Sequence, residues 1–301
     1  MGRFAPSPTG ELHLGSLYTA AASFLDARSH GGRWLVRMED VDRTREVSGA
    51  AAEILRTLEA FGFDWDAQVL RQSDRSDHYA AAIGRLRARG LTFECSCSRQ
   101  DLAGEGRYPG YCRSGPRDSS VATATRLRIE PQSITFGDRI QGSYAQDVAS
   151  VMGDAILRRR DGFFAYLLAV VVDDAAQGVT HVVRGADLLA DTPRQIYLQR
   201  SLGLQTPRYA HVPVLVESDG SKLAKSRRSV PASETDPQNQ LLKVLQWLEL
   251  EPPSALQGAP VGELWEWAHA HWASNRLRER SLQQLRVPNA SSELPRKPSL
   301  P

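Results

Sequence analysis

The sequence predicts an α/β fold built on a parallel β-sheet. Strand-like and helix-like segments alternate over residues 3–61, and the alternation returns after residue 162. Between them, residues 95–120 show no periodicity and are rich in Gly, Pro, Ser and Cys. A strand, a helix and a second strand in succession form a right-handed crossover, which makes the two strands parallel. The irregular stretch is therefore interpreted as a small insertion.

The first part of the chain contains two strand–helix pairs. Apolar residues at spacings of three and four predict the first helix, and Gly31 with Gly32 ends it. The predicted elements are, in order, a strand at 3–5, a turn at 6–10, a helix at 13–29, a strand at 34–38 and a helix at 47–61.

After the insertion the pattern resumes and then becomes helical. Strand-like pieces occur at 124–129 and 134–140, and the α/β pattern continues through 163–172, 181–184, a helix near 192–202, and 211–216. Helices are expected at 238–248 and 261–272, and the Pro/Ser-rich residues 287–301 are expected to form a disordered tail.

The composition indicates a cytoplasmic protein without a membrane partner. An apolar fraction of 41% allows a sizeable core, but no run of about 18 apolar residues suggests a membrane span. The N-terminus lacks the pattern of a signal peptide. A net charge of only +2 does not mark the chain as a whole as a nucleic-acid-binding protein. Basic residues cluster locally at 158–160 and 222–228, and such clusters are more often solvated faces than phosphate sites.

A loop between the first strand and the first helix is a candidate phosphate site. Gly10 and Gly15 permit close approach of backbone or ligand, and His13 opens the helix. The N-terminus of a helix presents free N–H groups and positive dipole, which favour a phosphate. Taken alone, this loop is equally compatible with an ordinary strand–helix connection.

A second loop places Lys222 and Lys225 after a predicted strand. Lysine is a mobile point charge that suits the phosphate charge growing during a transfer. Taken alone, such a loop is more often a solvated turn.

Together the two loops resemble the paired signatures of class I aminoacyl-tRNA synthetases, usually written HIGH and KMSKS. The first begins at His13 and departs from the pattern at Ser16, and the second departs at Ala224. The resemblance implies a Rossmann-like, parallel-sheet catalytic core that binds ATP with Mg²⁺. His13 and Lys225 would be catalytic, stabilising phosphate charge. The implied ATP-binding residues are His13, Gly15, Lys222 and Lys225.

Further segments resemble the glutamyl branch of that class: RFAPSPTG at 3–10, RMEDVD at 37–42, FAYLLA at 164–169, VVDD at 171–174 and HVVRGADLL at 181–189. The resemblance implies that a carboxylate of L-glutamate is held by Arg3, Tyr166 and Arg184. The ammonium group would be held by Ala5, Ser7 and Glu39. Arginine can grip a carboxylate through two parallel hydrogen bonds. Glutamine would leave that charge unpaired, so we expect the pocket to reject it.

The three cysteines, Cys95, Cys97 and Cys112, lie in the irregular stretch. An odd, local set without a secretory signal argues for reduced thiols or a metal rather than disulfides. Tetrahedral zinc needs a fourth ligand, and three free thiols remain the alternative. The spacing resembles the Cys-x-Cys…Tyr-x-x-x-Cys site of glutamyl-Q tRNA synthetases, which implies Tyr108 as that ligand and a structural role for the zinc. Tyr111 is the weaker candidate.

Only residues 227–301 follow the second signature, too few for the anticodon-binding domain of a full glutamyl-tRNA synthetase. The chain therefore resembles the short glutamyl-Q tRNA(Asp) synthetase family. That resemblance implies transfer of glutamate to queuosine at the wobble position of tRNA(Asp), with a monomer meeting the anticodon loop. The implied division is a first catalytic half (1–94), a zinc-binding insertion (95–120), the remaining catalytic half with the lysine signature (121–230), a helical region (231–286) and the tail (287–301).

Three alternatives stay open at this point. The chain could be a truncated glutamyl-tRNA synthetase core that charges tRNA(Glu), or a non-catalytic RNA-binding paralogue. It could also be a nucleotidyltransferase of the same superfamily that adenylates a small acid, which the glutamate pocket argues against.

Overall fold

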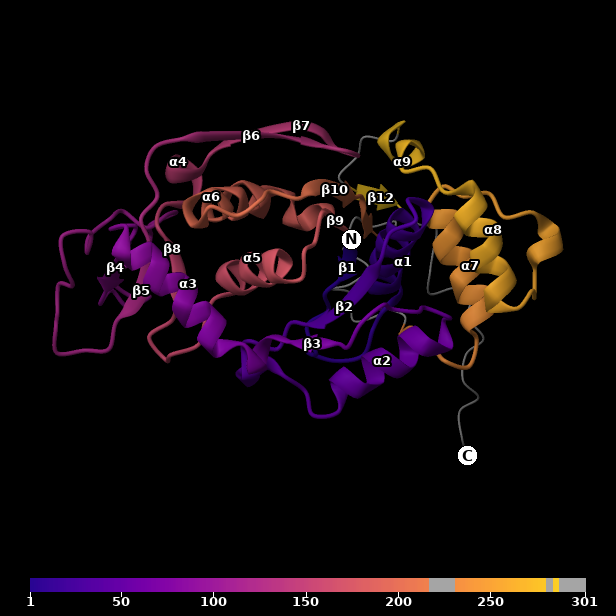
Figure 1. The fold of residues 1–301 in the computed structure, drawn as a ribbon, viewed down its shortest axis with the longest axis horizontal. Coiled ribbons are helices and arrows are strands. Elements are labelled where there is room, and N and C mark those ends of the chain that lie inside the picture. The colour runs from indigo at the N-terminus through magenta and orange to yellow at the C-terminus, as the bar shows by residue number, and fades with distance from the viewer. Residues whose placement is uncertain (217–230, 280–283, 287–301) are drawn as a thin grey trace.

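The computed structural model describes residues 1–216, 231–279 and 284–286 (Figure 1). The helices are α1 (Leu14–Ser29), α2 (Ala50–Ala60), α3 (Ser76–Ala88), α4 (Val148–Met152), α5 (Tyr166–Ala176), α6 (Thr192–Leu202), α7 (Pro237–Trp247), α8 (Val261–His271) and α9 (Asn275–Glu279). The strands are β1 (Gly2–Phe4), β2 (Trp34–Met38), β3 (Leu70–Arg71), β4 (Thr92–Cys95), β5 (Ala124–Leu127), β6 (Ser133–Asp138), β7 (Gly142–Asp147), β8 (Ala155–Arg158), β9 (His181–Gly185), β10 (Arg208–Val212), β11 (Val214–Val216) and β12 (Gln284–Arg286).

A parallel sheet forms the centre of the molecule, as predicted. Strands β1, β2 and β3 pair in parallel, and β10 pairs in parallel with both β9 and β6. The two sets meet at β1 and β9, where the backbone N–H of His181 donates to the carbonyl oxygen of Met1 at 3.1 Å. The strands therefore lie in the order β3-β2-β1-β9-β10-β6. From the junction of β1 and β9, the connections proceed toward opposite edges of the sheet. Ligands of such sheets bind beyond the carboxyl ends of the strands at this switch point.

Helix α1 connects the sheet to the C-terminal helices through one aromatic core. The ring centroid of Phe24 lies 5.1 Å from that of Trp34 on β2 and 5.0 Å from that of Trp265 on α8. Edge-to-face pairs of this kind add about 0.5–1.5 kcal/mol each beyond the burial of their area. Helices α7 and α8 thus pack on the catalytic half (Figure 1).

The irregular stretch lies beyond an antiparallel sheet of β4, β5 and β8. Figure 1 shows β4 and β5 at one end of the long axis, with α7 and α8 at the other. Residues 96–123 contain no helix or strand, which agrees with the predicted loss of periodicity. No helix among the described residues is long and apolar enough to span a membrane.

Several elements differ from the sequence prediction. Helix α2 begins only at Ala50, because Gly49 adopts a left-handed φ of 83° that a helix cannot contain. Helix α3 was not predicted, although its buried residues repeat at three and four. Residues 163–172 lead into and begin helix α5. The region predicted to be helical, residues 231–286, also contains β12, which pairs with β11. The predicted tail at 287–301 lies outside the described residues.

Candidate active site

A cleft of about 510 Å³ opens at the carboxyl ends of β1 and β9. It is lined by every described residue for which a glutamate or ATP role was predicted: Arg3, Ala5, Ser7, His13, Gly15, Glu39, Tyr166 and Arg184. Lys222, Lys225 and the departure at Ala224 lie outside the described residues. Sequence segments more than 150 residues apart thus supply a single cavity.

The N-terminus of α1 places His13 in this cleft. His13 is the N-cap of the helix, and its Nδ1 accepts a hydrogen bond of 3.1 Å from the backbone N–H of Ser16. A Cβ at Gly15 would lie 3.2 Å from that same Nδ1, so glycine leaves room for the imidazole ring. Burial lowers the pKa of His13. The ring is therefore neutral near pH 7, and its Nε2 lies 3.2 Å from Ser16 Oγ at the positive end of the helix.

Beneath the cleft, four charged side chains alternate in sign. Asp174 contacts Arg3 (Oδ1 to Nε, 3.2 Å) and Arg37 (Oδ1 to Nη1, 2.8 Å), and Arg37 Nη2 lies 3.3 Å from Glu39 Oε1. Burial opposes ionisation of Asp174, but the charges of Arg3 and Arg37 outweigh it and lower its pKa. Buried charges need such partners, because an unpaired one is strongly destabilising. Arg37 and Asp174 belong to the motifs at 37–42 and 171–174, yet the sequence reasoning gave them no role.

A second buried chain of contacts orients Arg184. Its Nε donates to His211 Nε2 at 3.0 Å and its Nη2 donates to Thr192 Oγ1 at 2.8 Å. Since His211 Nε2 accepts this bond, the proton of the neutral ring lies on Nδ1, which donates to Asp138 Oδ2 at 2.6 Å. Burial lowers the pKa of His211 even though Asp138 opposes the effect. His211 and Asp138 were not predicted as site residues, because nothing local to either position marks the pairing.

The guanidinium of Arg184 keeps one nitrogen for a ligand. Arg184 is 4% exposed, and its Nη1 is buried without a hydrogen-bond partner among the described residues. An unpaired charged donor is costly unless a ligand accepts from it. The arrangement therefore suits a carboxylate in the cleft.

Glu39 and Tyr166 complete the polar wall of the cleft. Burial raises the pKa of Glu39, and the charges of Arg37 and Arg3 offset this only in part. A ligand ammonium group would therefore favour its ionised form. Burial, followed by the charge of Glu39, raises the pKa of Tyr166 to about 12, so its hydroxyl remains a donor. The cleft thus contains both cationic and acceptor groups, which an acidic amino acid requires.

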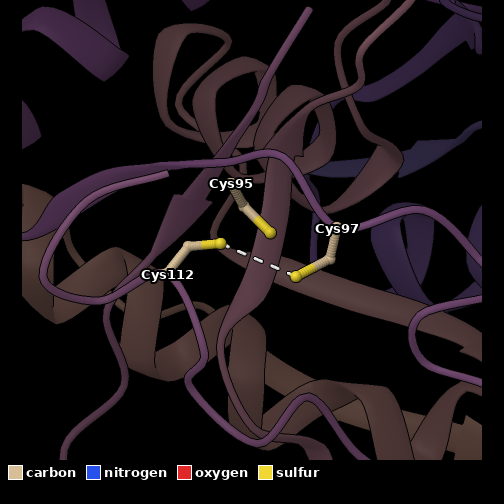
Figure 2. A group of neighbouring side chains, drawn as sticks. All are labelled: Cys95, Cys97 and Cys112. Carbon is tan, nitrogen blue, oxygen red and sulfur yellow. Dashed lines mark hydrogen bonds between the residues drawn. The ribbon is translucent and has the colours of Figure 1, made fainter. Parts of the chain in front are cut away.

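The three cysteines converge at the end of β4 (Figure 2). Their sulfur atoms all lie within 4.8 Å of one another, and Cys97 Sγ is 3.6 Å from Cys112 Sγ. Tetrahedral zinc with Zn–S bonds of about 2.3 Å separates two sulfur ligands by roughly 3.8 Å. The three thiols are therefore close enough together to act as ligands of one metal ion.

Tyr108 and Tyr111 differ in their relation to the cluster. The hydroxyl oxygen of Tyr108 lies 3.4 Å from Cys95 Sγ, close to the roughly 3.5 Å expected between sulfur and oxygen ligands of one zinc ion. The hydroxyl of Tyr111 instead donates to Glu105 Oε1 at 2.9 Å. The guanidinium of Arg126 lies 3.9 Å from the centroid of the Tyr108 ring. This buried cation can compensate the negative charge of thiolate ligands.

The pKa values within the cluster diverge. Burial disfavours thiolate at Cys112, but N–H groups of Arg117 and Ser96 and the Tyr108 hydroxyl outweigh it and lower the pKa to about 6. Burial, then hydrogen bonds with the neighbouring thiols, raises the pKa of Cys97 to about 11. A metal cation would provide the charge needed to ionise the remaining thiols.

The comparisons with known proteins agree with this geometry. Residues 1–251 match the family described as the catalytic domain of class I tRNA synthetases for E and Q, that is, glutamate and glutamine. Fold and cleft thus define a class I synthetase core.

Two relatives carry a name more specific than that family description, and both are named glutamyl-Q tRNA(Asp) synthetase. The protein of Ectopseudomonas mendocina (strain ymp) is 52% identical over 289 residues, covering 95% of this chain and 98% of the relative. That of Thiobacillus denitrificans is 54% identical over 279 residues, covering 90% and 93%. The chain belongs to the glutamyl-Q tRNA(Asp) synthetase family.

Two solved structures share the fold. A glutamate tRNA ligase from Elizabethkingia meningosepticum, in complex with its amino acid, aligns with a TM-score of 0.68 at 26% identity over 75% of this chain. The aligned part is 51% of that ligase, so the chain spans about half of its length. A glutamate-tRNA synthetase from Elizabethkingia anophelis aligns with a TM-score of 0.78 at 23% identity, over 95% of this chain and 67% of the other, and supports the fold alone.

Proposed function

We propose that this enzyme activates L-glutamate with ATP and transfers it to queuosine at the wobble position of tRNA(Asp). The observation that carries the proposal is Arg184 Nη1, buried and without a partner among the described residues, in the same cleft as Glu39. One group calls for a carboxylate and the other for an ammonium. The names of the relatives, glutamyl-Q tRNA(Asp) synthetase, support queuosine of tRNA(Asp) as the acceptor of glutamate.

The reaction has two steps. A carboxylate oxygen of glutamate attacks the α-phosphorus of ATP, pyrophosphate leaves, and glutamyl-adenylate forms. A hydroxyl oxygen of queuosine then attacks the acyl carbon of the adenylate. The ester C–O bond forms as the bond from the acyl carbon to the AMP oxygen breaks, AMP leaves, and the hydroxyl proton passes to solvent.

The chain contributes positioning and charge to this chemistry. A carboxylate group of glutamate is held by Arg3, Tyr166 and Arg184. Its ammonium group is held by Glu39, Ser7 and the backbone of Ala5. His13, Gly15, Lys222 and Lys225 bind ATP, which carries Mg²⁺, and His13 and Lys225 stabilise phosphate charge.

Cys95, Cys97, Cys112 and Tyr108 would hold one structural Zn²⁺. With four protein ligands the metal would support the fold of the insertion rather than the reaction. The enzyme acts as a monomer in the cytoplasm and meets tRNA(Asp) at its anticodon loop.

The test is transfer of labelled glutamate to tRNA(Asp) with and without queuosine. We expect transfer only to the modified tRNA, retained by an isolated anticodon stem-loop, together with glutamate-dependent ATP–pyrophosphate exchange. Transfer to the 3′ end of tRNA(Glu) instead would identify a truncated glutamyl-tRNA synthetase, and absence of exchange would identify a non-catalytic RNA-binding protein.

A further inference from the structure

A second cavity of about 350 Å³ adjoins the main cleft. The two share Ser7, Thr9, Glu39 and Tyr166 in their walls, whereas His13 and Gly15 line only the main cleft. The shared wall consists largely of predicted glutamate-binding residues. The amino-acid pocket therefore lies between the second cavity and the residues at the N-terminus of α1.

The second cavity is acidic and partly apolar. Its charged residues are four carboxylates and two arginines: Glu39, Asp40, Asp42, Glu46, Arg45 and Arg159. Half-buried Phe164 and Ile156 provide apolar surface. Asp42 Oδ2 is held at 2.7 Å by Arg159 Nη1, and its Oδ1 accepts from Thr44 Oγ1 at 2.6 Å. An excess of carboxylates disfavours phosphate and suits a ligand that carries a cation.

A buried acceptor in this cavity lacks a donor. Gln72 is fully buried and its Nε2 donates to Asp173 Oδ2 at 3.0 Å. Its Oε1 has no hydrogen-bond partner among the described residues. Buried polar atoms are nearly always paired, so this oxygen is available to an N–H or O–H of a ligand.

We infer that the second cavity binds the acceptor nucleoside and selects one whose side arm carries a protonated amine and hydroxyl groups. This inference rests on the proposed function. Queuosine has a planar base, a secondary amine that is protonated near neutral pH, and a cyclopentene diol. The base packs against Phe164, the ammonium faces Asp42, and an N–H or O–H of the arm donates to Gln72 Oε1. Unmodified guanosine has neither the amine nor the diol.

A neighbouring cavity matches the backbone of the same nucleotide. This cavity, of about 510 Å³, is lined by Arg87, Arg158 and Arg160, and it shares Arg159 with the second cavity. Arginine is well suited to phosphate oxygens. An acidic nucleoside cavity next to an arginine-lined one fits a single nucleotide of RNA.

The test separates acceptor binding from amino-acid activation. Asp42→Asn keeps the size of the side chain and removes its charge, and Phe164→Leu removes the aromatic face. We expect each variant to lower kcat/KM for glutamate transfer to queuosine-modified tRNA(Asp) by roughly tenfold. ATP–pyrophosphate exchange should stay within about twofold of wild type. Glu59→Gln, an exposed acid on α2 that lines neither cavity, is the matched control.

Two results would overturn the inference: unchanged transfer in both variants, or equal losses of transfer and exchange, which would assign the cavity to glutamate or ATP. The proposed function fails in a different way. In that case the wild-type enzyme itself would not transfer glutamate to queuosine-modified tRNA(Asp), whatever the variants do.

Discussion

The glutamate cleft and the cysteine cluster are built in opposite ways. The cleft depends on contacts between distant parts of the chain, such as Arg3 with Asp174, 171 positions apart. The cysteine cluster takes its ligand candidates from residues 95–112 alone. Loss of a bound metal ion from such a local cluster would therefore leave the central sheet folded. The cleft cannot lose a buried charge without leaving another unpaired.

The largest expected effect is on the cleft. Arg184→Ala should lower kcat/KM for glutamate in pyrophosphate exchange by on the order of 100-fold or more, chiefly through KM, because a buried charged contact to the substrate is lost. Arg184→Lys should recover only part of the loss, since lysine lacks the planar fork. Arg200→Ala, an exposed arginine on α6, is the control. A wild-type KM in Arg184→Ala would disprove the pocket assignment.

The next effect tests whether the cysteine cluster is independent of the cleft. Cys97→Ser should abolish stoichiometric zinc and lower the thermal midpoint by about 3–5 °C, which corresponds to roughly 2–3 kcal/mol in a protein of this size. Pyrophosphate exchange should remain within about threefold. Metal analysis and calorimetry measure the first two quantities. Zinc-free wild-type protein, purified without chelators, would end the zinc assignment.

A smaller effect concerns the contacts behind Arg184. Asp138→Asn should raise KM for glutamate by roughly tenfold while kcat stays within about threefold, because Arg184 is misdirected rather than removed. His211→Gln, whose amide oxygen can accept from Arg184 Nε, should lose less. A fall in kcat as large as the rise in KM, in both variants, would indicate a general structural defect instead.

The same contacts predict a pH dependence. The pKa of His211 in the folded protein is below its unfolded value of about 6.5, because burial disfavours the imidazolium. Below that value the unfolded chain binds the extra proton, so this histidine makes stability rise with pH up to about 6.5. Wild-type unfolding free energy should therefore fall between pH 6.5 and 5 more steeply than that of His211→Gln. Parallel curves from denaturant titrations would contradict this.

The smallest effect distinguishes two tyrosines of the insertion. Tyr108→Phe should speed the release of zinc to a chelator, because one oxygen ligand is lost while three thiolates remain. Tyr111→Phe should release zinc at the wild-type rate, since its hydroxyl contacts Glu105 instead. Equal release from both variants would remove Tyr108 from the ligand set.

Local pattern allowed much of the fold to be predicted. Strand 34–38 and the helices around 13–29, 192–202, 238–248 and 261–272 agree with the structure to within a residue or so, because spacing of apolar residues reflects which face is buried. Helix α3 shows the limit, since its charged and small residues hide a short apolar stripe. The glutamate-binding roles predicted for residues such as Arg3 and Glu39 came from resemblance, since singly each could be an ordinary surface or salt-bridge residue.

The parallel α/β order, the helix start at His13 and the grouping of three cysteines follow from the sequence alone, because each depends on neighbours within a few turns of chain. The position of Asp174 between Arg3 and Arg37, and the contacts by which Asp138 and His211 hold Arg184, are visible only in the folded protein. Those pairs come from strands and helices that the sheet brings together across 27 to 171 positions. A buried charge has no local signature, since its partner is chosen by the packing of the sheet rather than by spacing along the chain.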